Sequence, residues 1–172
     1  MHNGLRDDSD LIEFKVCNVS VTGCVFWITQ ANVLRVGFHR SDVVTDNISI
    51  TDCDVIHLAQ GWYYARFSLL AIISRPRRSL QKHSNYTIED IRFEDHCAVV
   101  AINNSEAKIR NLVFRNIQMI EPSKWPSLIN CAGIDTESGI WFENVRIGGK
   151  KVTSLEELSL IVTEQSQNVT ID

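Results

Sequence analysis

The sequence predicts an all-β protein, a right-handed single-stranded parallel β-helix of about 5–6 coils with roughly 29 residues in each coil. Three observations favour this solenoid: an internal repeat, apolar alternation with period two inside each copy, and a second apolar stretch after each copy. The 172 residues are 44% hydrophobic and 22% charged. This composition suits one domain over residues 1–172 with a sizeable core.

The repeat is a short unit whose copies start at positions 18, 47, 85, 111, 139 and 168. The spacings between these starts are 29, 38, 26, 28 and 29 residues. Self-similarity at such a period is typical of solenoids, in which each coil packs against its neighbours. The longest spacing indicates an insertion at residues 58–68, which we expect to form a loop on one face.

Each copy predicts a strand, a one-residue bend and a second strand. Positions two and four are apolar, as in a strand with one buried face, and positions seven and nine are apolar again. The residue types at position six tolerate a left-handed conformation. They are Gly23, Asp52, Asp90, Asn116 and Asn144. We therefore expect positions two, four, seven and nine to point inward. One predicted ladder of position-four side chains is Val21, Ile50, Ile88, Phe114 and Phe142.

A second apolar stretch follows each copy and predicts another strand in every coil. The stretches are residues 33–37, 69–73, 98–102, 127–130 and 160–162. One short helix is expected at Ser154–Leu158, because Ser154 and Glu157 have the spacing of a capping box. The five cysteines form no CxxC pair, so we interpret them as small buried apolar residues and expect no metal site and no cofactor.

Charge and hydropathy exclude several partners. The net charge is −4 without a basic stripe, which argues against nucleic acid, and no apolar run approaches the ~18 residues of a membrane span. The polar start, Met1 to Asp8, lacks the pattern of a signal peptide. The chain is therefore cytoplasmic, a processed form or a piece of a longer protein, and the sequence leaves its compartment open.

The sequence resembles the C-terminal part of pectin-lyase-like, β-helical glycoside hydrolases of the polygalacturonase and dextranase type. The segments that carry this resemblance are residues 9–27, 33–38, 54–57 and 145–153. The resemblance implies hydrolysis of glycosidic bonds of a polysaccharide or oligosaccharide in a groove on the outer face of the β-helix. It also implies a secreted or periplasmic setting. The Gly-His-Gly and Arg-Ile-Lys motifs of polygalacturonases are absent, so the catalytic motif is incomplete.

The resemblance places Asp10 at the second position of the Asp-Asp pair of dextranase-like enzymes, with Ser9 at the first. Asp7 and Asp8 lie nearby. An inverting glycosidase needs a general acid and a general base, which these carboxyl groups would supply. The alternative interpretation is a solvated acidic segment or the remnant of a site.

Further residues are candidates for substrate binding. Arg35 interrupts an apolar strand, so we expect it to point outward and to bind sugar hydroxyls or a uronate, or else to be a surface charge. Trp62 and Tyr63 lie in the long insertion and would stack on sugars or pack over the solenoid. His39 would shuttle protons or form a structural hydrogen bond, as would His57.

Two other functions stay open at this point. One is a non-catalytic β-helix for glycan binding or assembly, similar to a tail-spike or adhesin segment, and the other is a polysaccharide lyase. A solenoid has two ends that expose strand edges. No capping helix is predicted at either end, so we expect a homo-oligomer or a fragment of a longer β-helix that continues N-terminally.

Overall fold

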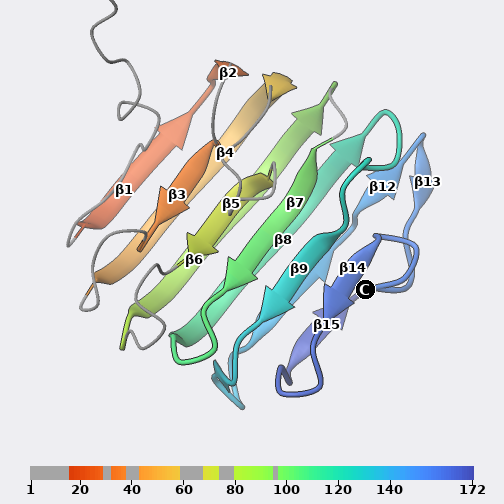
Figure 1. Cartoon of the computed structure of the whole chain (residues 1–172). Coiled ribbons are helices and arrows are strands. Elements are labelled where there is room, and N and C mark those ends of the chain that lie inside the picture. Colours follow the sequence, from red (N-terminus) through yellow and green to blue (C-terminus); the bar gives the residue numbers. More distant parts are fainter. Residues whose placement is uncertain (1–15, 29–31, 38–42, 59–67, 74–79, 95–96) are drawn as a thin grey trace, which may run out of the picture.

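The computed structural model describes residues 16–28, 32–37, 43–58, 68–73, 80–94 and 97–172. Six of the predicted site residues lie outside these ranges: Asp7, Asp8, Asp10, His39, Trp62 and Tyr63. Over the described ranges every regular element is a β-strand, and the strands form two sheets that lie one behind the other (Figure 1).

The larger sheet has ten strands. Six of them follow one another as parallel neighbours: β1 (Val16–Thr22), β4 (Val44–Leu58), β6 (Lys82–Phe93), β8 (Lys108–Met119), β11 (Ile140–Glu143) and β15 (Val169–Ile171). Four short strands complete it: β2 (Val25–Ile28), β10 (Gly133–Ile134), β12 (Arg146–Ile147) and β13 (Lys150–Lys151). Only β13 runs antiparallel, in a hairpin with β12 through Gly148 and Gly149, both of which have positive φ.

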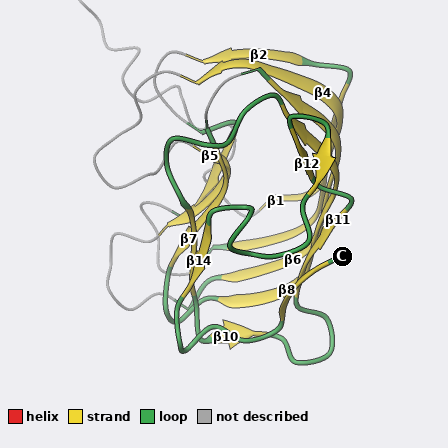
Figure 2. Cartoon of the chain, turned by 90° about the vertical axis from the view of Figure 1, so that its right-hand side faces the viewer, coloured by secondary structure: helices red, strands yellow, loops and turns green. Residues whose placement is uncertain are grey.

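The smaller sheet has five parallel strands, and it is built from the second apolar stretch of each coil. Its strands are β3 (Leu34–Val36), β5 (Ser68–Ile73), β7 (Ala98–Asn103), β9 (Ser127–Asn130) and β14 (Leu160–Val162). The chain alternates between the two sheets, so each coil closes around a shared core (Figure 2). The predicted parallel β-solenoid is thereby confirmed.

The bends of the ten-stranded sheet use the left-handed conformation, as predicted for position six. Asp52 has a φ of 51°, and Asp90, Asn116 and Asn144 have similar values. Position one is a second left-handed corner that we did not predict, as at Asn47 with a φ of 54°. At each corner two successive side chains point outward, so the alternation of inward and outward residues is interrupted there. The two corners divide β4 into three short segments, and the corresponding segments of neighbouring strands form three panels of the sheet.

The inward positions stack in register along the solenoid, as the repeat predicts. Position four pairs Val21 with Ile50, and its ladder continues through Ile88, Phe114 and Phe142. The rings of the last two are stacked, with centroids 4.8 Å apart and planes 9° from parallel. This distance matches the spacing of neighbouring strands, so the aromatic stack follows from the coil repeat itself.

The five-stranded sheet is buried on both faces over β3, β5 and β7, whereas the outward position of β9 is half-buried and that of β14, Ile161, is 47% exposed. In β5 every residue is buried, and the outward Ala71 and Ala101 are 0% and 2% exposed. Arg35 is paired with Ala71 in register and lies on the opposite face from Leu34 and Val36. Its side chain is only 5% exposed, so the expectation of an exposed outward arginine is wrong. The outward positions next to it in the ladder, Ala71 and Ala101, are buried as well, so this face of the sheet is shielded from solvent at β3, β5 and β7.

Two further expectations need correction. Ser154–Leu158 forms turns rather than a helix: Ser154 Oγ accepts from Glu157 N at 3.1 Å, but Ser159 has a φ of 54° and the chain enters β14 at once. Among the cysteines, Cys53, Cys97 and Cys131 are buried as expected, but Cys17 is exposed and Cys24 is intermediate. All five are free thiols.

The end strands β1 and β15 each pair with a neighbour on one side. At β1, Val19 and Val21 are partly buried, whereas their equivalents in β4, Ile48 and Ile50, are both 2% exposed. The expectation that another copy or a further coil covers these ends stays a prediction.

Candidate functional site

The outward face of the ten-stranded sheet carries ladders of polar side chains. The clearest is repeat position eight, two residues beyond the second corner. Its members are Val25, Asp54, Arg92, Gln118 and Arg146, which are register partners on adjacent strands. A carboxylate, two guanidinium groups and an amide therefore line up at the spacing of β-strands.

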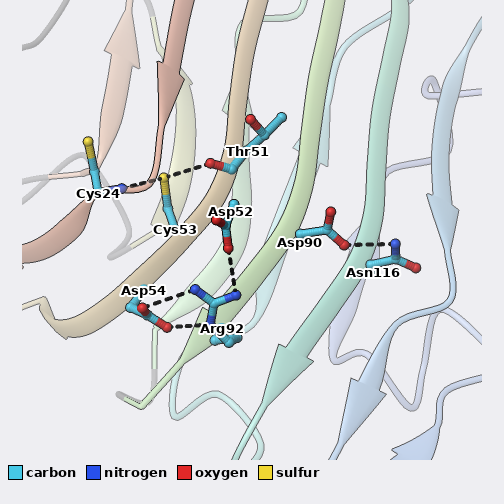
Figure 3. Close-up of polar contacts among 8 residues, drawn as sticks. All are labelled: Cys24, Thr51, Asp52, Cys53, Asp54, Asp90, Arg92 and Asn116. Carbon is cyan, nitrogen blue, oxygen red and sulfur yellow. Dashed lines mark hydrogen bonds and ion pairs between the residues drawn. The ribbon is translucent and has the colours of Figure 1, made fainter.

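Arg92 is held by two aspartates of the preceding coil. Its Nε and Nη2 atoms donate to the two carboxylate oxygens of Asp54, at 2.5 and 3.0 Å, and Nη1 donates to Asp52 at 3.0 Å (Figure 3). The hydrogen bonds from Arg92 lower the pKa of Asp54, and those to Asp54 and Asp52 raise the pKa of Arg92. The guanidinium plane is thus fixed on the surface by a bidentate pair.

A hollow of about 410 Å³ lies beside this ion pair. Its polar lining is Asp54, Arg92, Glu94, Gln118 and Arg146. The hairpin glycines of β12–β13 and the exposed side chain of Ile120 also line it. A hollow of this size falls within the range of small-ligand sites, and its lining offers both hydrogen-bond acceptors and donors.

Arg146 is the most available donor of the hollow. Its Nε donates to Asn144 Oδ1 at 3.3 Å and its Nη1 to the carbonyl of Gly149 at 3.2 Å. Within the described part of the chain, no carboxylate pairs with it. Its remaining N–H groups are free to meet a ligand.

An aromatic pair follows Asp54 along β4 and β2. Trp27 is 68% exposed, and its ring centroid lies 5.2 Å from that of His57, with the planes tilted by 43°. The two residues are register partners just after the irregularity between Phe26 and Trp27. His57 is therefore engaged with an aromatic ring, and the exposed ring of Trp27 lies outside the residues that line the hollow.

Polar ladders hold this face rigid. At the corners, Asn111 Nδ2 donates to Asn85 Oδ1 at 2.9 Å, and Asn116 Nδ2 donates to Asp90 Oδ1 at 2.9 Å (Figure 3). In the middle panel, Arg115 Nε donates to Glu143 at 2.6 Å and Nη1 to Glu89 at 3.4 Å. Each ladder joins side chains at the same repeat position on neighbouring strands.

The perturbed carboxyl groups of this surface are held in their ionised form. Hydrogen bonds from Ser84 and Asn85 lower the pKa of Asp46, and backbone N–H groups of Ser138 and Glu137 lower the pKa of Asp135. Asp54 shifts in the same direction. A general acid of a glycosidase needs a raised pKa. These three carboxylates are therefore suited to accept hydrogen bonds and not to donate a proton.

A buried polar network crosses the core where β4 and β6 begin. Thr45 Oγ1 lies 2.7 Å from His83 Nδ1 and 2.5 Å from the Tyr86 hydroxyl, and His83 Nε2 lies 3.2 Å from Gln81 Oε1. Gln81 Nε2 donates to the Gly37 carbonyl, which leaves Oε1 as the acceptor from Nε2–H of the ring. Burial lowers the pKa of His83 to about 3, so the ring is neutral.

The structure tests the predicted site residues only in part. Asp7, Asp8, Asp10, His39, Trp62 and Tyr63 lie outside the described residues, so their roles stay predictions. Arg35 and His57 are not brought together, because they belong to different sheets. In the described ranges no group of three or more His, Cys, Asp or Glu side chains is placed to hold a metal ion, and no helix has the length and apolarity to cross a membrane.

The polar ladder at position eight was missed in the sequence, although a signal for it exists. Asp54 and Arg92 occupy the same repeat position in successive copies. In a parallel solenoid this makes them neighbours, whatever the length of the insertion between them. The buried His83 network had no such signal, because Thr45, Gln81 and His83 precede the repeat unit and only Tyr86 belongs to it.

Comparison of the chain with protein-family models, with curated proteins and with solved structures finds no match. The fold and the geometry of the outward face are thus the basis for a functional assignment.

Proposed function

We propose that the chain is a carbohydrate-binding β-solenoid, which holds a polysaccharide or oligosaccharide on the outward face of the ten-stranded sheet. The observation that carries the proposal is the 410 Å³ hollow with its mixed polar lining. Sugar hydroxyls donate and accept hydrogen bonds at once. The carboxylates of Asp54 and Glu94 offer acceptors, Arg92 and Arg146 offer donors, and the Gln118 amide offers both.

Apolar surface beside the polar groups also supports a sugar ligand. Ile120 in the hollow is 60% exposed, and Trp27, on the strand β2 that pairs with β4, presents a ring that is 68% exposed. The C–H faces of a pyranose ring are apolar and pack against such side chains, while the hydroxyls at its edge reach polar partners. The parallel β-solenoid fold is compatible with proteins that act on polysaccharides.

A finer proposal is hydrolysis of glycosidic bonds, and the resemblance of residues 9–27 to β-helical glycoside hydrolases supports it. Asp46, Asp54 and Asp135 do not fit the general acid, because their pKa values are lowered. Under this proposal the reaction depends on Asp10 with Asp7 or Asp8. A lyase has no comparable support from the described residues.

Binding is tested with the intact chain on a glycan array, followed by calorimetry with the glycan that binds best. Gln118→Ala and Arg146→Ala should each weaken binding about three- to tenfold, the equivalent of one hydrogen bond. Gln167→Ala is the matched control, because Gln167 is exposed and lies outside the hollow. An array without any bound glycan, or binding that ignores both substitutions, would overturn the proposal.

Hydrolysis is tested separately by the release of reducing sugar from dextran and from neutral and acidic plant polysaccharides. Turnover that Asp10→Asn abolishes while binding persists would support the hydrolase. Binding without turnover on every substrate would remove the hydrolase proposal and leave the binding function.

A further inference from the structure

A second hollow, of about 490 Å³, lies at the opposite ends of β6 and β8, before the first corner. We call it the basic hollow, and we define it by Lys82, Lys108, Arg110, Asp135 and Thr136. It combines three cations with one carboxylate, although the whole chain has a net charge of −4. A cluster of three positive side chains in a negatively charged chain suggests that this place on the surface binds an anion.

The two lysines are direct neighbours. Lys82 and Lys108 are register partners on adjacent parallel strands, where like charges oppose each other unfavourably. No residue in the described ranges forms an ion pair with either of them. The next register partner is Gly133, where an added Cβ would lie 2.1 Å from the Ala107 carbonyl and 3.0 Å from Lys108 Cδ. The space beside Lys108 is therefore kept free of a side chain.

Arg110 completes the cluster two residues beyond Lys108. It pairs in register with Ser84, and two carboxylates, Asp46 and Asp135, lie near enough to interact with its charge. Both carboxylates are committed elsewhere. Asp46 accepts from Ser84 Oγ at 2.7 Å and from Asn85 Nδ2 at 2.8 Å.

Asp135 Oδ1 accepts from the backbone N–H groups of Glu137 and Ser138, both at 2.9 Å, and from the Ser138 hydroxyl at 3.0 Å. Neither Asp135 nor Asp46 forms a hydrogen bond with the Arg110 guanidinium in the described structure. The guanidinium fork is thus available to a ligand.

We propose that the basic hollow is an oxyanion-binding site for a carboxylate or sulfate group. The Arg110 fork would bind two oxygens, the ammonium groups of Lys82 and Lys108 would bind the remaining charge, and the exposed Thr136 hydroxyl would add a donor. An anion between the two lysines would remove their repulsion, and it would take the place of the carboxylate that neither lysine has in the described ranges.

The source of the oxyanion follows from the proposed function and rests on it. A glycan that carries uronate or sulfate groups would bring the anion to the same outward face. The two hollows lie on different panels of the sheet, separated by both corners, so the oxyanion site is distinct from the hollow at Arg92.

The site is tested by NMR titration of the ¹⁵N-labelled chain with sodium sulfate and with sodium galacturonate at constant ionic strength. We expect saturable amide shifts at Lys82, Lys108, Arg110 and Thr136. The double variant Lys82→Met/Lys108→Met keeps the apolar stems and should weaken binding at least about tenfold. The control Lys124→Met/Lys150→Met removes two charges outside the hollow and should leave binding unchanged.

Several results would overturn the site. They are the absence of saturable shifts, equal weakening in the control, and competition by chloride as effective as by sulfate. Tight binding of duplex DNA that depends equally on the two lysines would also overturn the site, because it would show that the lysines attract any polyanion.

The source is tested with oligogalacturonate, sulfated dextran and unsulfated dextran. Tighter binding of one charged polymer than of its monomer supports a glycan source, and equal binding overturns that part alone. Binding of unsulfated dextran tests the proposed function independently of the oxyanion site. If Gln118→Ala weakens this binding and the lysine variant does not, the proposed function stands whatever the outcome for the oxyanion site.

Discussion

The two sheets of the solenoid are built from the same coil repeat, but they differ in how far their outward faces are exposed to solvent. The ten-stranded sheet has one buried face, and its outward positions hold charged and amide ladders such as Asp54–Arg92–Gln118. In the five-stranded sheet the outward positions of β3, β5 and β7 are also buried, and they hold Arg35, Ala71 and Ala101. The same ladder opens to solvent at its other end, where Leu128 is half-buried and Ile161 is 47% exposed. Parallel strands with two covered faces are typically continuous apolar runs, whereas strands with one wet face alternate.

This difference shows where function can reside. In the ten-stranded sheet outward polar groups recur at several repeat positions, and both hollows described above lie on it, whereas the outward positions within the five-stranded sheet are mainly apolar. The five-stranded sheet contributes packing. Substitutions at equivalent outward positions should therefore have unequal consequences in the two sheets.

The largest effect is expected on the inward ladder that both sheets enclose. Phe114→Ala removes a 0% exposed ring from the stack with Phe142 and should lower the free energy of unfolding by about 3–5 kcal/mol. Val113→Ala, the outward neighbour, should cost about 0.5 kcal/mol or less. Urea unfolding followed by circular dichroism measures both. Similar losses at the two positions would contradict the assignment of inward and outward faces.

The comparison of the outward faces is tested by placing the same charge on each sheet. Ala101→Asp buries a carboxylate without a partner and should cost about 3–5 kcal/mol. Thr87→Asp occupies an outward position of β6 and should cost about 1 kcal/mol or less. The same unfolding assay compares the two variants. If Ala101→Asp is tolerated as well as Thr87→Asp, the five-stranded sheet does not have a covered outer face.

A smaller effect is expected from pH, because His83 is a buried base on the inward side of β6. The unfolded chain binds a proton at this residue below about pH 6.5, whereas the folded chain resists until about pH 3. As the pH is lowered from 6.5 to 4.5, the contribution of His83 should therefore reduce the free energy of unfolding by about 1.4 kcal/mol per pH unit. Urea titrations over this range measure the slope. His83→Gln removes one proton from the difference between the unfolded and folded states, so it should lower the slope by about 1.4 kcal/mol per pH unit. An unchanged slope would show that His83 is not buried and neutral.

The smallest effect concerns the corners, which only the ten-stranded sheet uses as a series. Asn111→Ala places an ordinary side chain at a φ of 53° and removes the hydrogen bond to Asn85, so it should cost about 1–2 kcal/mol. Asn111→Gly loses the same hydrogen bond but fits the left-handed conformation, and should cost less. Thermal unfolding of the pair separates the two contributions. If the two variants lose the same stability, backbone strain contributes nothing and Asn111 stabilises the corner through its hydrogen bond alone.

Much of the fold could be predicted because a solenoid makes distant residues equivalent. Once Val21 and Ile50 occupy the same repeat position, their contact follows without knowledge of the intervening loop. The same logic would have placed Arg92 beside Asp54. The first corner was missed although asparagine, a residue type that tolerates the left-handed conformation, recurs at position one. The prediction of a helix at Ser154–Leu158 is wrong, since a capping box needs further helical turns to propagate a helix.

The sequence by itself determined the coil, its period, the inward ladders and the residues of the second corner, because these depend on local alternation and on residue types repeated in every copy. Only the tertiary structure decided which outward face is covered, as at Arg35, and which charges are neutralised, as at Asp54, or left available, as at Lys108. Burial and pairing are properties of neighbours in space. A side chain on an outward strand position carries the same sequence pattern whether its next neighbour is solvent, a carboxylate or another segment of the chain.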